Sequence, residues 1–333
     1  MSVLPRDRAL VWCVGAAALS GAVHVPGLLS PAVRADELVY VAAFVAADAG
    51  LPLSGVAGWY YPAPLAQAGA ALGSGATLVL WRLGNLLGSA LTCGAAGRVL
   101  GGGRIGLGLA MAAALMWSPP VTEGIAVGNV SGLVCGLILA ASMMPWLASS
   151  VLLAGTFVFK PLALAAVLGR PVRAALLPIG AATLAMWASP GRGALLNLTA
   201  TSNASPAGVL AEWGLPWQVW TASVLVVAVV WGRGSWSRGL CLGWLSVPLA
   251  WTHTGVLLVV PWAWALAGSQ AEPQRDRRLL RQLVLLFAGV VVVRAGMFAV
   301  EGFSALRLLP GFAAVLIAVW SGSGSGGVSL RRG

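Results

Sequence analysis

Residues 9–29 of the chain read ALVWCVGAAALSGAVHVPGLL, a stretch that carries no formal charge. A transmembrane helix needs about 20 consecutive apolar residues to cross the hydrocarbon core of a bilayer. Arg6 and Arg8 precede the stretch, as basic residues precede the apolar part of a secretory signal, but no clear A-x-A cleavage site follows it. We therefore interpret 9–29 as the first membrane helix of the mature protein.

The rest of the chain has the same apolar character. Of its 333 residues 59% are hydrophobic, and 20 basic and 9 acidic residues are too few to cover the surface of a soluble domain of this size. This composition excludes a water-soluble enzyme and predicts an all-α polytopic membrane protein with about twelve transmembrane helices. Beyond the first, the predicted crossings are 76–97, 105–118, 128–144, 146–159, 161–169, 172–188, 218–232, 239–252, 254–268, 283–300 and 308–320.

The net charge of +11 comes almost entirely from arginine, and its placement argues against nucleic acid as a partner. The arginines gather in short segments between apolar runs, which is typical of the cytoplasmic loops of membrane proteins. The bias toward Arg over Lys, with abundant Ala, Gly and Val, suggests a bacterium with a high-GC genome. We therefore predict a multi-pass protein of a bacterial plasma membrane, with long loops at about 30–75 and 189–217 facing outward.

The predicted domain organisation is simple. Residues 1–320 are expected to form one integral membrane domain, with interfacial helices in the first external loop. Residues 321–333 are rich in Ser and Gly and predict a flexible cytoplasmic tail. The four cysteines lie within or beside apolar runs without metal-ligand spacing, so they indicate packing residues and predict neither a zinc site nor a disulfide.

The adjacent carboxylates Asp36 and Glu37 follow the first apolar run and open a segment that extends to Gly50. We expect this segment to be an interfacial helix. A carboxylate pair at the membrane surface suits a general base or a metal ligand. The alternative is a negative charge that only stabilises the start of a short helix. Glu123 is expected in a turn within the sequence PPVTEGI.

Three basic side chains stand in apolar surroundings. Lys160, the single lysine of the chain, interrupts the sequence FVFKP, and Arg82 interrupts LWRLGN. Such a cation can bind a phosphate, or it can extend to the membrane interface along its own aliphatic stem. His253 falls at a predicted external junction in WTHTG. A titratable group at that depth is costly unless it faces a cavity or has a partner, which makes His253 a candidate functional residue.

The order of short motifs along residues 35–255 resembles glycosyltransferase family 87, which includes the polyprenyl-phosphate-mannose-dependent mannosyltransferases of actinobacteria. The motifs are, in order, Asp36 with Tyr40, Tyr60-Tyr61-Pro62, Gly128-Asn129, Lys160-Pro161, Asn203-Ala204-Ser205 and Trp251-Thr252-His253. The chain differs from the family at Val130, where a small polar residue is common, and at Thr254, where a second His is common.

The resemblance implies a GT-C fold with an active site on the outer face of the membrane. It implies Asp36 as the catalytic base and His253 near the donor phosphate. As groups that stabilise the departing phosphate we expect Lys160 and His253 first, with Arg82, Arg192 and Arg307 behind them. Glu37 would assist Asp36. The remaining substrate-binding residues would be Tyr40, Tyr60, Tyr61, Asn129 and Asn203.

The expected reaction is inverting transfer of a sugar, mannose before arabinose, from a polyprenyl-phosphate donor to a lipid or glycan acceptor. No nucleotide-binding loop is needed for such a donor, and no cofactor or metal is expected, although Glu37 could hold a divalent cation. The alternatives are a transporter or flippase, in which the buried cations line a path, and a noncatalytic partner in envelope assembly.

Overall fold

The computed structural model of the chain describes residues 8–57, 59, 61–102, 104–159, 172–189, 205–231, 236–246, 252–269, 280–286, 288–289 and 308–320. Within these residues the protein is helical and contains no strand, which confirms the prediction of an all-α fold. The α-helices are α1 (Arg8–Gly21), α2 (Val25–Leu29), α3 (Ala35–Asp48), α4 (Ala63–Leu72), α5 (Ser74–Gly101), α6 (Ile105–Leu115), α7 (Pro119–Val127), α8 (Ser131–Ser142), α9 (Trp146–Phe159), α10 (Val172–Ala188), α11 (Pro206–Glu212), α12 (Trp217–Trp231), α13 (Trp236–Ser246), α14 (Val256–Ser269) and α16 (Leu309–Trp320). Short 3₁₀ helices are η1 (Ala22–His24), η2 (Leu53–Gly55) and η5 (Thr252–Gly255).

The helices follow the apolar runs of the sequence closely. Helices α9 and α10 coincide with two of the predicted crossings, and α3 occupies the segment predicted as an interfacial helix. One local prediction was wrong, because the segment around Glu123 forms helix α7 rather than a turn. Pro119 and Pro120 occupy the first two positions of α7, where a missing backbone N–H costs no helical hydrogen bond, so they start the helix.

Several other predictions fall wholly or partly outside the described residues. They concern the crossing at 161–169, most of the crossing at 283–300 and the tail at 321–333.

The described residues contain one helical run, Arg8–Gly27, that is long and apolar enough to cross a membrane by itself. Two bent pairs raise this number to three if each pair is one span: α4 with α5, bent by 110°, and α6 with α7, bent by 45°. Helices α8, α9, α12, α14 and α16 are apolar but shorter. The described part therefore has the character of a membrane protein, while the figure of about twelve crossings and the GT-C fold remain predictions.

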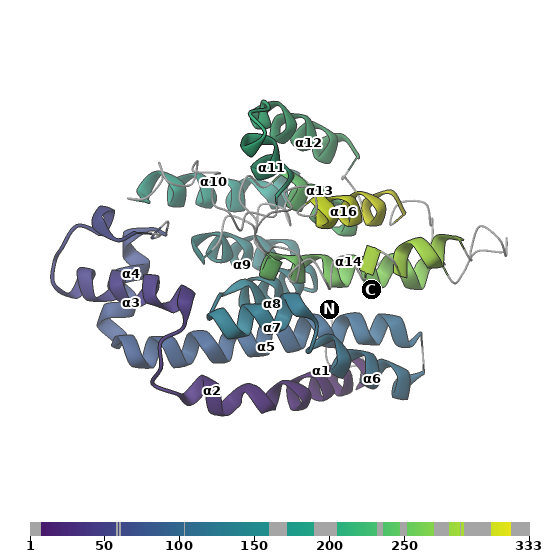
Figure 1. The fold of residues 1–333 in the computed structure, drawn as a ribbon, viewed down its shortest axis with the longest axis horizontal. Coiled ribbons are helices and arrows are strands. Elements are labelled where there is room, and N and C mark those ends of the chain that lie inside the picture. Colours follow the sequence, from purple (N-terminus) through teal and green to yellow (C-terminus); the bar gives the residue numbers. More distant parts are fainter. Residues whose placement is uncertain are drawn as a thin grey trace.

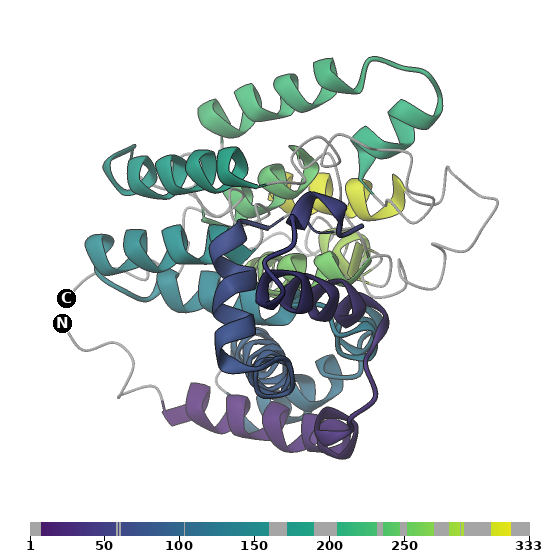
Figure 2. The same cartoon turned by 90° about the vertical axis from the view of Figure 1, so that its left-hand side faces the viewer.

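Helix α5 forms the central support of the N-terminal half. It packs against α1, α6, α8 and α14 along its length, and α3 and α4 lie at one of its ends, with α6 near the other (Figure 1). Figure 2, which views the molecule from the end that carries α3 and α4, shows these two helices in front of α5. Gly73, with φ +82°, joins α4 to α5 at the 110° bend.

Small residues allow the helices around α5 to approach closely. A Cβ atom added at Gly88 of α5 would lie 2.3 Å from the carbonyl oxygen of Gly132 in α8, and one at Gly97 would lie 2.6 Å from that of Gly108 in α6. Close backbone contact of this kind is the usual way in which membrane helices associate, because lipid supplies no hydrophobic force between them. The glycines of α5 thereby set the positions of α6 and α8.

Candidate functional site

The first turn of α3 is tied to α5 by a buried ion pair. Glu37 is 1% exposed and Arg82 of α5 is 4% exposed. The Glu37 carboxylate accepts hydrogen bonds from Arg82 Nε at 2.7 Å and from Arg82 Nη2 at 2.6 Å. Glu37 also accepts the backbone N–H of Arg34 at 2.8 Å, which caps the start of α3. A buried carboxylate that is paired and hydrogen-bonded in this way fixes the orientation of its helix.

The guanidinium of Arg82 has further partners in the segment before α3. It donates to the carbonyl oxygen of Ser30 at 2.6 Å and to that of Ala32 at 2.7 Å. These contacts hold the chain between α2 and α3 against α5. Arg82 was expected among the groups that bind the donor phosphate, whereas in the structure its guanidinium donates to Glu37 and to these two carbonyls.

Asp36, one residue before Glu37, contacts a different element. Its Oδ2 accepts a hydrogen bond of 2.5 Å from Nδ2 of Asn129, which lies between α7 and α8. The Oδ1 of Asn129 in turn accepts the backbone N–H of Ser131 at 3.0 Å and the Ser131 hydroxyl at 2.7 Å. Asp36 is partly exposed and Asn129 is buried. The structure thus brings together two residues that the family resemblance assigns to one site and that are 93 positions apart in the chain.

The turn that carries Asn129 is built on Gly128. Gly128 ends α7 in the left-handed conformation with φ +76°. A Cβ atom at this position would lie 2.5 Å from Cγ of Glu37, so any other residue would clash with the ion pair. Glycine is therefore required here both for its backbone conformation and for the close approach to Glu37.

Asn85 is a residue of the site that the sequence analysis missed. It is buried on α5, three residues after Arg82 and therefore on the same side of the helix. Its Nδ2 donates to the carbonyl oxygen of Gly124 at 3.4 Å, and its Oδ1 accepts the N–H of Leu133 at 3.2 Å. Asn85 thus holds the turn between α7 and α8 against α5. The signal was available in the sequence as a second polar residue, one turn from Arg82, in an apolar helix.

An aromatic cluster borders the same turn of α3. Tyr40, one turn after Asp36, is 2% exposed, and its hydroxyl lies 3.2 Å from that of the partly exposed Tyr61. The ring of Trp59 lies 5.0 Å from that of Tyr61, between ring centroids, and the cluster also includes Phe44 and Trp81. Burial, together with Tyr61 and the carboxylates of Asp36 and Glu37, holds the pKa of Tyr40 well above its usual value. The Tyr40 hydroxyl can therefore act as a neutral hydrogen-bonding group.

The remaining predicted site residues are located only in part. Lys160, Tyr60, Asn203, Arg192 and Arg307 lie outside the described residues. His253 belongs to η5, which packs against α7, but its side chain also lies outside the description. In the part of the chain that the structure describes, no group of three or more His, Cys, Asp or Glu side chains is arranged to hold a metal ion.

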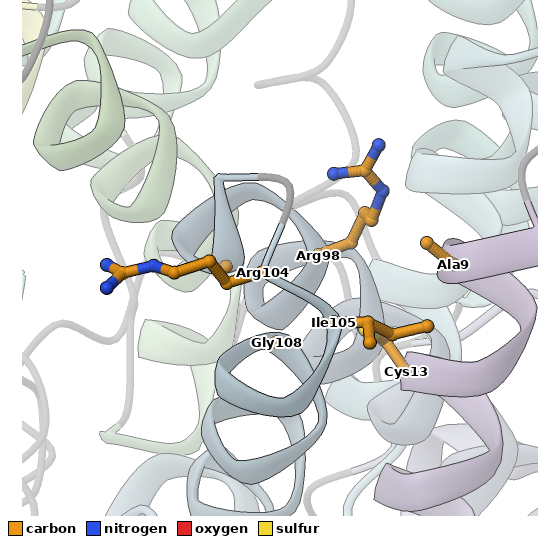
Figure 3. Close-up of a pocket in the computed structure, with 7 residues that line it drawn as sticks. Ala9, Cys13, Arg98, Arg104, Ile105 and Gly108 are labelled. Carbon is orange, nitrogen blue, oxygen red and sulfur yellow. The ribbon is translucent and has the colours of Figure 1, made fainter.

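A small cavity lies between α1, α5 and α6, away from α3. Its volume is about 50 Å³, and its lining includes Cys13, Arg98 and Arg104. Figure 3 shows that the side chains of Arg98 and Arg104 extend in different directions instead of converging on one point. Ligand pockets usually measure about 300 to 1,000 Å³, so this cavity is too small for a sugar or a lipid headgroup.

Comparisons with known proteins found no match: no family model, no curated protein and no solved structure is similar to this chain.

Proposed function

We propose that the protein is a membrane glycosyltransferase that transfers a sugar, with mannose as the first candidate, from a polyprenyl-phosphate donor to a lipid or glycan acceptor. The observation that carries this proposal is the Asp36 carboxylate, which is partly exposed and is held through Oδ2 by Asn129. In the described residues, Oδ1 of Asp36 has no hydrogen-bond partner. A carboxylate with one oxygen held and the other accessible is suited to accept a proton.

In the proposed reaction, Oδ1 of Asp36 accepts the proton of an acceptor hydroxyl as the hydroxyl oxygen attacks the anomeric carbon of the donor sugar. The bond between that carbon and the phosphate oxygen breaks on the opposite face, and the polyprenyl phosphate leaves with the electron pair. The configuration at the anomeric carbon is therefore inverted. General-base catalysis of this kind contributes about 10² to 10⁴ in rate.

The departing phosphate needs positive charge or hydrogen-bond donors as the glycosidic bond breaks. Lys160 and His253 are the proposed groups. Arg82 already neutralises Glu37 and donates to two carbonyls, so we assign it to holding the first turn of α3 in place. Support for His253 comes from the packing of η5 against α7, the helix that leads directly to Gly128 and Asn129.

The aromatic cluster beside Asp36 supports a sugar as the substrate. Aromatic rings offer apolar faces to the C–H groups of a sugar ring, and hydroxyl groups at their edges form hydrogen bonds. Tyr61 is partly exposed, and its hydroxyl is paired with that of Tyr40. We propose that Tyr61 contacts the bound sugar and that Tyr40 fixes the orientation of the Tyr61 hydroxyl.

The location and fold follow from the same proposal. A polyprenyl phosphate is reached from the bilayer, which fits a chain whose described helices are largely apolar. We propose a GT-C fold in a bacterial plasma membrane with Asp36 facing outward, in line with the resemblance to glycosyltransferase family 87.

The direct test is sugar transfer by the purified protein in detergent or vesicles, supplied with radiolabelled polyprenyl-phosphate-mannose and a membrane lipid extract. We expect label to move to an acceptor, and Asp36→Asn to lower turnover by about 10² or more because the proton acceptor is removed. The control is Asp48→Asn, which changes an exposed carboxylate at the other end of α3 and should retain full activity.

Two results would contradict the enzyme. Transfer that is equally fast in Asp36→Asn would remove the assigned base. Movement of the labelled lipid across vesicles without transfer to any acceptor would favour a flippase instead.

A further inference from the structure

The orientation of the Asn129 carboxamide follows from its neighbours. The backbone N–H of Ser131 can only donate, and it lies 3.0 Å from one terminal atom of Asn129, so that atom is the oxygen. The NH₂ group is therefore the one that faces Asp36, at 2.5 Å from Oδ2. The Ser131 hydroxyl, at 2.7 Å from the same Asn129 oxygen, strengthens this orientation. Asn129 consequently presents a donor, and never an acceptor, to the carboxylate of Asp36.

The position of Asn129 is held as firmly as its orientation. Asn85 binds the turn on both sides, through the carbonyl of Gly124 and the N–H of Leu133. The close approach of Gly128 to Glu37 leaves no room for the turn to move toward α3. Asn129 is also buried, with 5% of its surface exposed. These features describe a group that supports another side chain and has little surface left for a substrate.

We propose that Asn129 is a positioning residue: it holds Oδ2 of Asp36 by a charge-assisted hydrogen bond, so that Oδ1 of the ionised carboxylate is directed at the acceptor hydroxyl. This role differs from the substrate binding expected from the sequence, and it rests on the proposed function of Asp36 as the base. A hydrogen bond to a charged group is stronger than one between neutral groups, and it is lost when Oδ2 is protonated.

The proposal explains why an amide is needed at position 129. Aspartate has nearly the same shape, and its carboxylate would still accept the two hydrogen bonds from Ser131. It would, however, place a second negative charge against Oδ2 of Asp36, and two carboxylates at this distance share one proton. Asn129→Asp therefore keeps the packing, but it replaces the attraction between residue 129 and Asp36 with repulsion between two carboxylates.

Kinetics separate positioning from substrate binding. If Asn129 positions the base, Asn129→Ala should lower kcat by about 10- to 100-fold and leave KM for donor and acceptor almost unchanged. Asn129→Asp should require a higher pH than the wild type for turnover. Ser131→Ala, which removes one of the two donors to Oδ1 of Asn129, should have a smaller effect on kcat. A raised KM with an unchanged kcat would overturn the proposal.

A second measurement does not depend on activity. A water-soluble carbodiimide with glycine ethyl ester modifies protonated carboxyl groups, and mass spectrometry reports the modified fraction at each residue. In Asn129→Asp we expect labelling of Asp36 to persist to a pH about one unit or more higher than in the wild type. Asp48, exposed on the same helix, is the internal control and should show the same profile in both proteins.

The labelling result also keeps the two proposals distinguishable. An Asp36 profile that is the same in Asn129→Asp and in the wild type would show that the side chains do not interact and would overturn the positioning role. If the wild type transfers no sugar but the Asp36 profile shifts as expected, the positioning of Asp36 stands and the proposed reaction fails.

Discussion

Asp36 and Glu37 are adjacent in the chain, but their carboxylates lie in different surroundings. Successive residues of a helix point about 100° apart, so one turns toward α5 and the other toward the turn after α7. Glu37 is buried against Arg82, whereas Asp36 is partly exposed and meets a neutral donor, Asn129. The buried pair holds the helix, while the carboxylate of Asp36 stays partly exposed.

Gly128 offers a test of this arrangement at the scale of one residue. We expect Gly128→Ala to destabilise the protein by about 1 kcal/mol from its positive φ, and by a further 1 to 3 kcal/mol because the added Cβ would lie 2.5 Å from Glu37. It should also abolish sugar transfer, since the turn that carries Asn129 must shift. The measurement is thermal unfolding in detergent micelles, followed by the transfer assay.

The matched control for Gly128 is Gly50→Ala. Gly50 has a similar φ of +66°, but nothing lies within 4 Å of an added Cβ. Gly50→Ala should therefore lose only the stability that its positive φ costs, and sugar transfer should be retained. Equal losses of stability in the two variants would mean that the contact between Gly128 and Glu37 is unimportant.

At the scale of elements, the site depends on how α5 meets α8. Gly88 lies one to two turns beyond Arg82 and Asn85 on α5, and it packs directly on the backbone of α8 at Gly132 and Leu133. The spacing of these two helices therefore sets where the start of α8, and with it Ser131 and Asn129, lies relative to α5. The sequence shows the glycines, but the partner of each one is visible only in the folded protein.

We expect Gly88→Ala to force α5 and α8 apart, because the added methyl would lie 2.3 Å from the Gly132 carbonyl oxygen and backbone cannot move aside as a side chain can. Stability in micelles should fall by about 1 to 3 kcal/mol, and transfer should fall with it. The control is Gly84→Ala on the same helix. Its Cβ would meet only the side chain of Leu133, at 3.3 Å, which can adjust. If Gly84→Ala were the more damaging of the two, the proposed packing role of Gly88 would be incorrect.

At the scale of the whole molecule, the proposal requires the segment around α3 to face outward and the loop between α5 and α6 to face the cytoplasm. Single cysteines at two exposed positions test this: Ser54→Cys, in the first long loop, and Gly106→Cys, at the start of α6. The four described native cysteines are all buried and should react slowly.

If the arginine-rich loops face the cytoplasm as proposed, a membrane-impermeable maleimide should label Ser54→Cys in intact cells, and Gly106→Cys only after permeabilisation. The parent protein measures the background from the native cysteines. The reverse pattern would place Asp36 on the cytoplasmic side, and the outward-facing reaction would have to be abandoned.

The helical character of the chain and the positions of most helices can be predicted from the amino-acid sequence alone. Long apolar runs that end at Gly, Pro or Arg leave the backbone only the helix as a way to satisfy its hydrogen bonds in an apolar environment. For this reason α9 and α10 coincide with their predicted ranges. The prediction was wrong at α7, where the segment PPVTEGI forms a helix instead of a turn because its two prolines fit the first helical positions.

The contacts between polar side chains, in contrast, are visible only in the folded protein. Asp36 and Glu37 were visible as a pair, but nothing in their spacing showed that one contacts Asn129 and the other contacts Arg82, positions separated from them by 93 and 45 residues. Asn85 was visible as a polar residue one turn from Arg82, but its contacts with Gly124 and Leu133 were not. Such contacts depend on the angles and distances between packed helices, which arise from many small side-chain and glycine contacts together, and no local pattern in the sequence encodes them.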